Sequence, residues 1–262
     1  MRILILGFPR SGTTILYKIF CEVLKDHVKL YEPFNDFVNL TDGFAIHDYM
    51  PIENNYHLLD PETRQTLVSN IWFEKFVQGK CKYGGDYEKV FTLLSKYENL
   101  LVKDIYIWPI VPEIRESLLK DWKIVVIYRD VKKIFEDLLK WYYQSQPWLN
   151  RRPIYLGKNG VMFYHPDIIW GLSLYYRQLF KKDPLKKMLP DKWLYGPGEI
   201  LYLLVETYDK FIELMSPIAD YEIIHDRLVQ SPEYEIGKMF YELGIPVDTP
   251  VVKKVASLVK PL

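Results

Sequence analysis

Short apolar runs alternate along the chain with longer stretches in which apolar residues recur at helical spacing. The short runs predict buried strands at 2–6, 28–31, 100–103, 123–128 and 221–224. The longer stretches predict helices at 13–25, 61–78, 86–98, 110–120, 131–143, 167–181, 198–215 and 232–243. Strands that alternate with helices are typical of a parallel sheet with helices on both faces. We therefore expect a three-layer α/β fold.

The length and composition are those of a globular chain with a substantial core. Of its 262 residues, 49% are hydrophobic and 26% are charged. We expect a single domain over residues 1–262, with one long irregular segment at about 145–167, where Pro and Gly are frequent. Long loops in compact domains often form lids or the wall of a binding site, although a simple insertion would look the same.

Charge and cysteine content narrow the classes of partner and compartment. Lys and Arg number 34, as do Asp and Glu, so no overall positive charge attracts a nucleic acid. No apolar run approaches the roughly 18 residues of a membrane span, and the first run is broken at Pro9 and Arg10, too early for a secretory signal. Two free thiols, at Cys21 and Cys81, are more usual here than a disulfide. We expect a cytoplasmic protein, and its oligomeric state stays open.

A glycine-punctuated loop, Gly7-Phe8-Pro9-Arg10-Ser11-Gly12-Thr13-Thr14, joins the first predicted strand to the first predicted helix. Backbone NH groups and the positive end of the helix dipole meet in such a loop, and the hydroxyl groups of Ser11, Thr13 and Thr14 add donors. The spacing fits the ATP-binding P-loop except that Thr13 replaces its lysine, while the cation is Arg10. This pattern indicates a phosphate-bearing ligand and argues against ATP or GTP hydrolysis. An ordinary strand-turn-helix connection is the alternative.

Charged residues also follow three other predicted strands. Glu32 comes after the strand at 28–31, Lys103 ends the strand at 100–103 and Asp104 follows it, and Arg129 follows the strand at 123–128. Because the carboxyl ends of parallel strands meet at one edge of a sheet, we expect these side chains near the loop. Arginine suits a phosphate, Glu32 could accept a proton, and Asp104 could hold Mg²⁺ as in a nucleotide kinase. Each is also compatible with a structural ion pair, a turn or a solvated strand end.

Four blocks of the chain resemble the sulfotransferases that use 3′-phosphoadenosine 5′-phosphosulfate (PAPS), and they come in the same order as in that family. Pro9 to Thr14 resembles the 5′-phosphosulfate loop. Lys103-Asp104 resembles the Lys-Asp step that tyrosylprotein and some carbohydrate sulfotransferases carry after their third strand, and Arg129 resembles the arginine that ends the strand of the 3′-phosphate motif. The block from Tyr221 to Pro246 is similar to the strand-Tyr-Glu-Asp-Leu-x-x-x-Pro-helix-Leu-Gly block, with His225-Asp226-Arg227 in place of Tyr-Glu-Asp.

The resemblance implies the sulfotransferase fold, PAPS as donor, its product 3′,5′-adenosine bisphosphate (PAP), and no metal. It implies that Arg10 and Lys103 offset charge on the departing phosphate, that Glu32 is the general base, and that Arg129 contacts the 3′-phosphate. The 5′-phosphate is expected to be held by Pro9, Arg10, Ser11, Gly12, Thr13 and Thr14. Glu32 with its following proline is similar to the carbohydrate and tyrosylprotein branches, so the resemblance implies a hydroxyl acceptor, with a carbohydrate or glycolipid slightly ahead of a tyrosine or phenol.

The chain departs from the family pattern at several positions. Asp137 stands where the 3′-phosphate motif carries a serine, and Ile105 stands where the cytosolic small-molecule branch has its catalytic histidine. Asp36 and Asp104 are reserve candidates for the base. The C-terminal glycine-rich motif is absent, and Lys253, Lys254 and Lys260 either replace it or form a solvated helix face.

These departures keep two other functions open. One is a P-loop kinase or phosphotransferase that uses Mg-ATP. The other is a nucleotide-binding module without turnover. Aromatic residues between 141 and 176 could line an acceptor pocket, although helical core packing is the more usual role for such residues.

Overall fold

The computed structural model describes residues 1–34, 43–47, 50–69, 86–105, 107–144, 156–157, 160–161 and 197–259. The chain forms two compact units, one made of Met1–Tyr128 and Met215–Leu262 and the other of Arg129–Leu214. We describe each unit by itself. The expectation of one domain over residues 1–262 stays a prediction.

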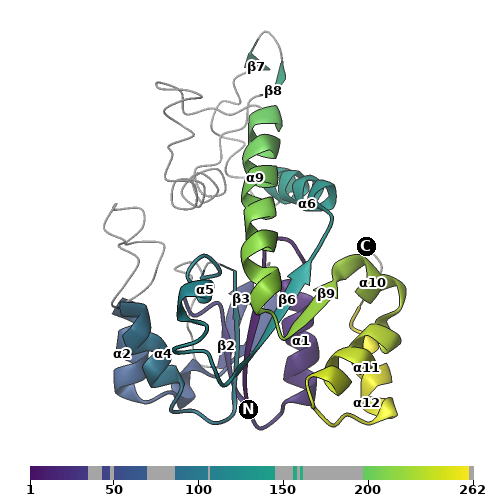
Figure 1. Cartoon of the computed structure of the whole chain (residues 1–262). Helices are drawn as coiled ribbons and strands as arrows, with labels where there is room; N and C mark the ends of the chain where they lie inside the picture. The colour runs from purple at the N-terminus through teal and green to yellow at the C-terminus, as the bar shows by residue number, and fades with distance from the viewer. Residues whose placement is uncertain are drawn as a thin grey trace. The chain divides into compact units, whose positions relative to one another are not determined.

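A five-stranded parallel sheet forms the centre of the first unit (Figure 1). Its strands, in spatial order, are β2 (Val28–Tyr31), β5 (Leu100–Asp104), β1 (Arg2–Gly7), β6 (Trp122–Tyr128) and β9 (Tyr221–Ile224). The apolar runs predicted these strands to within one residue at each end, because each run is short, nearly continuous and buried on both faces. The prediction of a parallel α/β sheet is confirmed.

Helices cover both faces of this sheet. On one face, α1 (Thr13–Val23), α11 (Pro232–Glu242) and α12 (Thr249–Ala256) bury their apolar sides against odd-numbered strand residues such as Ile5 and Ile127. Even-numbered strand residues point to the opposite face. There the ring of Trp122 packs edge-on against Phe91 of α4 (Asp86–Leu94), with centroids 5.9 Å apart. In Figure 1, α11 and the short α10 (His225–Gln230) lie beside β9, and α12 packs against α11.

An antiparallel hairpin that the sequence patterns did not predict lies next to β2. It consists of β3 (Gly43–His47) and β4 (Met50–Asn54), and η1 (Tyr56–Leu58) and α2 (Pro61–Ser69) follow it. Glu53 fixes the hairpin to the sheet unit, because its carboxylate accepts a hydrogen bond of 2.7 Å from the buried Lys29 ammonium of β2. Its backbone carbonyl accepts another, of 2.9 Å, from the Tyr17 hydroxyl of α1.

Several predicted helix boundaries need correction. Instead of the helix predicted at 110–120, an α-helix covers only Val111–Ile114 (α5), with turns after it. The helix predicted at 86–98 ends at Leu94, and the one predicted at 13–25 ends at Val23. The helix predicted at 61–78 is described only as far as Ser69. The short α10 was not predicted, while α12 (Thr249–Ala256) carries Lys253 and Lys254, for which a helix face was one of the two expectations.

The second unit contains two long helices, α6 (Val131–Gln144) and α9 (Pro197–Met215), which match the predictions at 131–143 and 198–215. A two-residue antiparallel pair, β7 (Leu156–Gly157) and β8 (Gly160–Val161), falls within the predicted irregular segment. The rest of 145–167 lies outside the described residues, as does the helix predicted at 167–181. No helix in the described part of the chain is both long enough and apolar enough to cross a bilayer.

Candidate functional site

The loop between β1 and α1 bends twice through the left-handed region of backbone conformation. Arg10 has a φ of 68° and Gly12 a φ of 98°, and the amide of Ser11 donates a 3.0 Å hydrogen bond to the carbonyl of Phe8. The second bend starts α1 at Thr13. The first NH groups of a helix have no carbonyl partner within it, so the loop and the helix start together form a cradle suited to an anion.

Close packing requires glycine at both ends of this loop. A Cβ atom at Gly7 would lie 2.4 Å from Cγ2 of Thr13, and one at Gly12 would lie 2.4 Å from Cδ2 of His225. His225, the first residue of α10, therefore lies directly against the loop. The hydroxyl of Ser11 is fully buried and has no hydrogen-bond partner among the described residues. An orphaned buried hydroxyl beside an anion cradle fits a ligand oxygen.

Two oppositely charged side chains meet at the carboxyl ends of β2 and β5. The ammonium of Lys103 donates a short hydrogen bond to the carboxylate of Glu32, and each side chain is 1% exposed. Glu32 has a φ of 45°, and its amide donates a 2.7 Å hydrogen bond to the Lys103 carbonyl. The mutual attraction offsets part of the cost of taking both charges out of water. The predicted base and the predicted lysine are thus brought together as a buried ion pair.

Tyr31 connects this pair to the loop. Its hydroxyl lies 2.9 Å from Oγ1 of Thr14, in the first turn of α1, and accepts a 3.4 Å hydrogen bond from Nζ of Lys103. The same ammonium lies over the Tyr31 ring, 4.4 Å from its centroid. The sequence patterns did not single out Tyr31. Its position just before Glu32, at the carboxyl end of β2, is the signal that could have found it.

The reserve candidates for the base have other positions. Asp104 is fully buried, and its Oδ1 accepts a 3.0 Å hydrogen bond from the amide of Ile107, so it caps the turn after β5. Asp36 lies outside the described residues. Within the described ranges, no three His, Cys, Asp or Glu side chains gather in a way that could hold a metal ion.

Arg129 directly follows β6 in the sequence and belongs to the second unit. Its Nη1 donates a 2.5 Å hydrogen bond to Oδ2 of Asp137 on α6, so the cation already faces a carboxylate. Its amide donates to the Tyr208 hydroxyl at 2.9 Å, and that hydroxyl donates to its carbonyl at 2.6 Å. Burial raises the pKa of Tyr208 to about 12. The expectation that Arg129 reaches the same edge as the loop stays a prediction.

The C-terminal lysines have a surface role where the structure describes them. Lys254 of α12 forms a 2.8 Å hydrogen bond to the carboxylate of Glu22 on α1. This contact, followed by one with Lys25, lowers the pKa of Glu22. The reading of a solvated helix face therefore holds for Lys254, and Lys260 lies outside the described residues.

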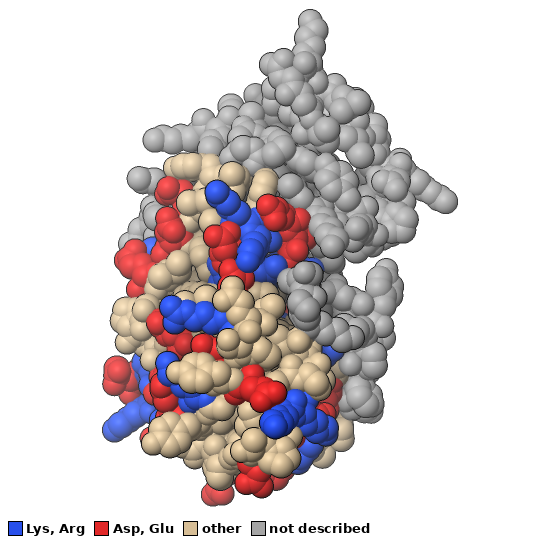
Figure 2. Space-filling view, turned by 90° about the vertical axis from the view of Figure 1, so that its right-hand side faces the viewer, with Lys and Arg blue, Asp and Glu red and all other residues tan. Residues whose placement is uncertain are grey.

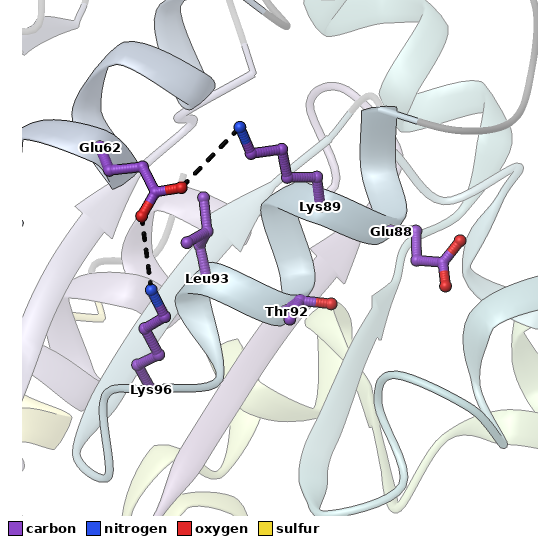
Figure 3. A pocket seen from close by; sticks show the side chains of 6 residues that line it. All are labelled: Glu62, Glu88, Lys89, Thr92, Leu93 and Lys96. Atoms are coloured by element: carbon purple, nitrogen blue, oxygen red, sulfur yellow. Dashed lines mark ion pairs between the residues drawn. The ribbon is translucent and has the colours of Figure 1, made fainter.

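A surface hollow of about 430 Å³ lies between α2 and α4 and is lined by none of the candidate site residues (Figure 3). Glu62 sits in it between Lys89 and Lys96, at 3.8 and 3.6 Å. The opposite charges there neutralise one another, and the described side chains that line the hollow include no His or Cys nucleophile.

The described surface in Figure 2 mixes acidic and basic side chains rather than gathering one sign. This agrees with the equal numbers of the two kinds in the sequence. The anion cradle of the loop is therefore a local feature. On the visible face, the described surface offers no single-signed area for a long polyanion.

No family model matches the chain, and no curated protein matches it. Among solved structures, the mouse sulfotransferase SULT7A1 in complex with PAP aligns with a TM-score of 0.43 and 13% identity, over 99% of this chain and 64% of that one. The sulfotransferase STF9 from Mycobacterium avium aligns with a TM-score of 0.48 and 9% identity, over 98% and 67%.

A third structure, retinol dehydratase with androsterone and the inactive cofactor PAP, gives a TM-score of 0.45 and 13% identity, over 99% of this chain and 65% of that one. The chain thus spans slightly less than two thirds of the mouse sulfotransferase and of the retinol dehydratase.

Proposed function

We propose that the chain is a PAPS-dependent sulfotransferase that transfers a sulfuryl group to a hydroxyl acceptor. One observation carries the proposal: an anion cradle at Gly7–Thr14 is hydrogen-bonded, through Tyr31, to the buried pair of Lys103 and Glu32. A phosphate site beside a cation and a carboxylate base has the three parts that sulfuryl transfer requires.

The reaction exchanges one sulfur-oxygen bond for another. The acceptor oxygen attacks sulfur in line with the 5′-phosphate oxygen, which leaves with the bonding electrons, and the acceptor proton passes to Glu32. The products are a sulfate ester and PAP. Arg10 and Lys103 offset the charge that grows on the departing phosphate, while the backbone NH groups of Ser11 to Thr14 hold it. Glu32 serves as base once Lys103 turns its ammonium towards the phosphate.

The acceptor class and the nucleotide contacts follow from the resemblance of the sequence motifs. A carbohydrate or glycolipid hydroxyl comes first, because the Glu-Pro step of Glu32 and Pro33 is the form similar to the carbohydrate branch. Arg129 is proposed to hold the 3′-phosphate, and Asp137 must then give up its ion pair to the incoming anion. Glu32 is chosen as base over Asp104, whose carboxylate caps a turn.

Calorimetric titration with PAP, and with ATP in the presence and absence of Mg²⁺, tests the donor site. We expect metal-independent binding of PAP and a much weaker response to ATP. Asp104→Asn is the matched control, because it should leave PAP binding intact while a kinase that holds Mg²⁺ through Asp104 would lose Mg-ATP. Preference of the wild type for Mg-ATP would overturn the sulfotransferase proposal.

Turnover separates the enzyme from a binding module that lacks it. Purified chain is incubated with radiolabelled PAPS and a panel of sugars, glycolipids and phenols, and the label in each acceptor is counted. Glu32→Gln should reduce transfer by a factor of about 100 to 10,000, the usual contribution of a general base, while PAP still binds. Equal transfer by the wild type and Glu32→Gln would rule out Glu32 as the base.

A further inference from the structure

We propose that Tyr31 is a positioning residue that couples occupancy of the phosphate loop to the Lys103–Glu32 pair. The inference rests on the proposed function and deepens it, because it assigns the link between the donor site and the catalytic pair. Its basis is one hydroxyl group that lies 2.9 Å from Oγ1 of Thr14 and 3.4 Å from Nζ of Lys103.

The number of hydrogens on each group gives this link a direction. The Lys103 ammonium can only donate, so the Tyr31 hydroxyl must accept from it. The Tyr31 hydroxyl has a single hydrogen, and Thr14 has another, so either can be the donor between them. When a phosphate oxygen in the loop takes the Thr14 hydrogen, Thr14 Oγ1 can only accept from Tyr31. A bound phosphate therefore orders the chain from Lys103 through Tyr31 and Thr14 to the ligand.

The surroundings of Tyr31 hold this hydroxyl in place. Its side chain is fully buried, and its ring packs edge-on against Tyr17 at a centroid distance of 5.3 Å. Lys103 lies over the same ring, so both the ring and the hydroxyl contact the ammonium. Successive hydrogen bonds polarise one another in a site that excludes water, so each bond in an ordered chain is strengthened.

The coupling would change how the Lys103 ammonium shares its hydrogen bonds between Glu32 and Tyr31. Without a ligand, the ammonium is held chiefly by the Glu32 carboxylate. An anion in the loop strengthens the bond to Tyr31 and draws the ammonium towards the donor side. Glu32 is then less tightly held and is available to take the acceptor proton. Donor binding would in this way prepare the base.

A double-mutant cycle on PAP affinity tests the coupling. Tyr31→Phe keeps the ring and removes the hydroxyl, and Thr14→Val keeps the shape and removes the other hydroxyl. We expect each variant to weaken PAP binding, measured by calorimetry, roughly fivefold or more, as for loss of one hydrogen bond linked to a charged group. The double variant should bind PAP no more than about twofold more weakly than Thr14→Val, because the link is already cut.

Two further variants separate positioning from a structural role. Thr14→Ser keeps the hydroxyl and should restore PAP affinity to near the wild-type value. Tyr17→Phe removes a neighbouring buried hydroxyl, which donates to the Glu53 carbonyl outside the link, and should leave PAP affinity unchanged. Melting temperatures of all variants are measured in parallel.

The outcomes distinguish failure of this inference from failure of the proposed function. If the wild type does not bind PAP, both are overturned. If the wild type binds PAP but the effects of Tyr31→Phe and Thr14→Val multiply, the two residues act independently and only the coupling is wrong. The coupling is also wrong if Tyr31→Phe lowers the melting temperature without changing PAP affinity.

Discussion

Replacing Lys103 by methionine would leave the Glu32 carboxylate enclosed without its cation. Both side chains are 1% exposed, so water cannot substitute for the missing partner. Removal of one member of a buried pair costs about 3–5 kcal/mol, which is a large part of the roughly 5–15 kcal/mol by which a folded domain is stable. Glu32→Gln should cost less, about 1.5–3 kcal/mol, because the ammonium keeps the Tyr31 hydroxyl and ring.

The double variant Lys103→Met/Glu32→Gln is the decisive measurement. It removes both charges and keeps the volume, so its cost should fall well below the sum of the single costs. Urea denaturation followed by tryptophan fluorescence gives the free energy of unfolding for all three variants. Lys25→Met is the matched control: Lys25 forms a 3.2 Å pair with Glu22 and is 62% exposed, so its loss should cost less than about 1 kcal/mol. Additive costs, or a Lys103→Met cost equal to the control, would refute the reasoning.

Three other outcomes follow from the geometry. Gly12→Ala should weaken PAP binding at least tenfold and lower the free energy of unfolding by about 2–4 kcal/mol, because Gly12 has a φ of 98° and its added Cβ would clash with a neighbour. Gly244→Ala is the comparison: Gly244 has a φ of 71° but open space around it, so the loss of unfolding free energy should be only about 1 kcal/mol. Asp137→Asn should remove the carboxylate that competes with a phosphate for Arg129 and raise the preference for PAP over adenosine 5′-monophosphate about tenfold, measured by calorimetry. Ellman's reagent should not label Cys21 at pH 8, because burial raises the pKa of its thiol from 9.0 to about 12. Between these two pKa values only the thiol of the unfolded chain ionises, so the free energy of unfolding should fall as the pH rises from about 9 to about 12.

Matched variants decide these outcomes. Asp130→Asn makes the same charge change on a carboxylate that caps α6 by accepting a 2.9 Å hydrogen bond from the amide of Lys132. This control variant should not alter nucleotide preference. If it acts as Asp137→Asn does, general charge rather than the ion pair sets affinity. A Cys81→Ser background leaves Cys21 as the only thiol, and rapid labelling there would contradict its burial.

Most of the first unit could be predicted from the sequence because its strands are short apolar runs with a single plausible role. The hairpin of β3 and β4 was missed for physical reasons. Its second strand contains Pro51, which cannot donate to a ladder, so the pattern argued against a strand. The predicted helix at 110–120 contains Pro112, which is tolerated at a helix start, and only one turn of α-helix follows there.

The candidate site was predictable in its parts and not in its connections. Glu32 and Lys103 could be predicted as site residues because the ends of their strands meet at one edge of the sheet. The sequence pattern does not reveal that the two side chains form an ion pair or that Tyr31 connects them to the loop. Likewise, the sequence pattern placed Asp137 at the serine position of the 3′-phosphate motif but did not show that its carboxylate pairs with Arg129. Contacts between side chains from separate strands and helices depend on packing, which the spacing of residues does not encode.

The central place of β1 in the sheet has a consequence for how the chain folds. Arg2 of β1 pairs with Leu100 on one side and with Trp122 on the other, so the strand that carries the loop gains its first neighbour about 100 residues later in the chain and its second only when β6 has also been synthesised. Closing such long parallel connections is slow, and an apolar strand that waits for partners is prone to aggregate. The ability to bind an anion should therefore emerge late during refolding, after most of the chain has become compact. Recovery of ligand binding would then report completion of the sheet rather than early collapse.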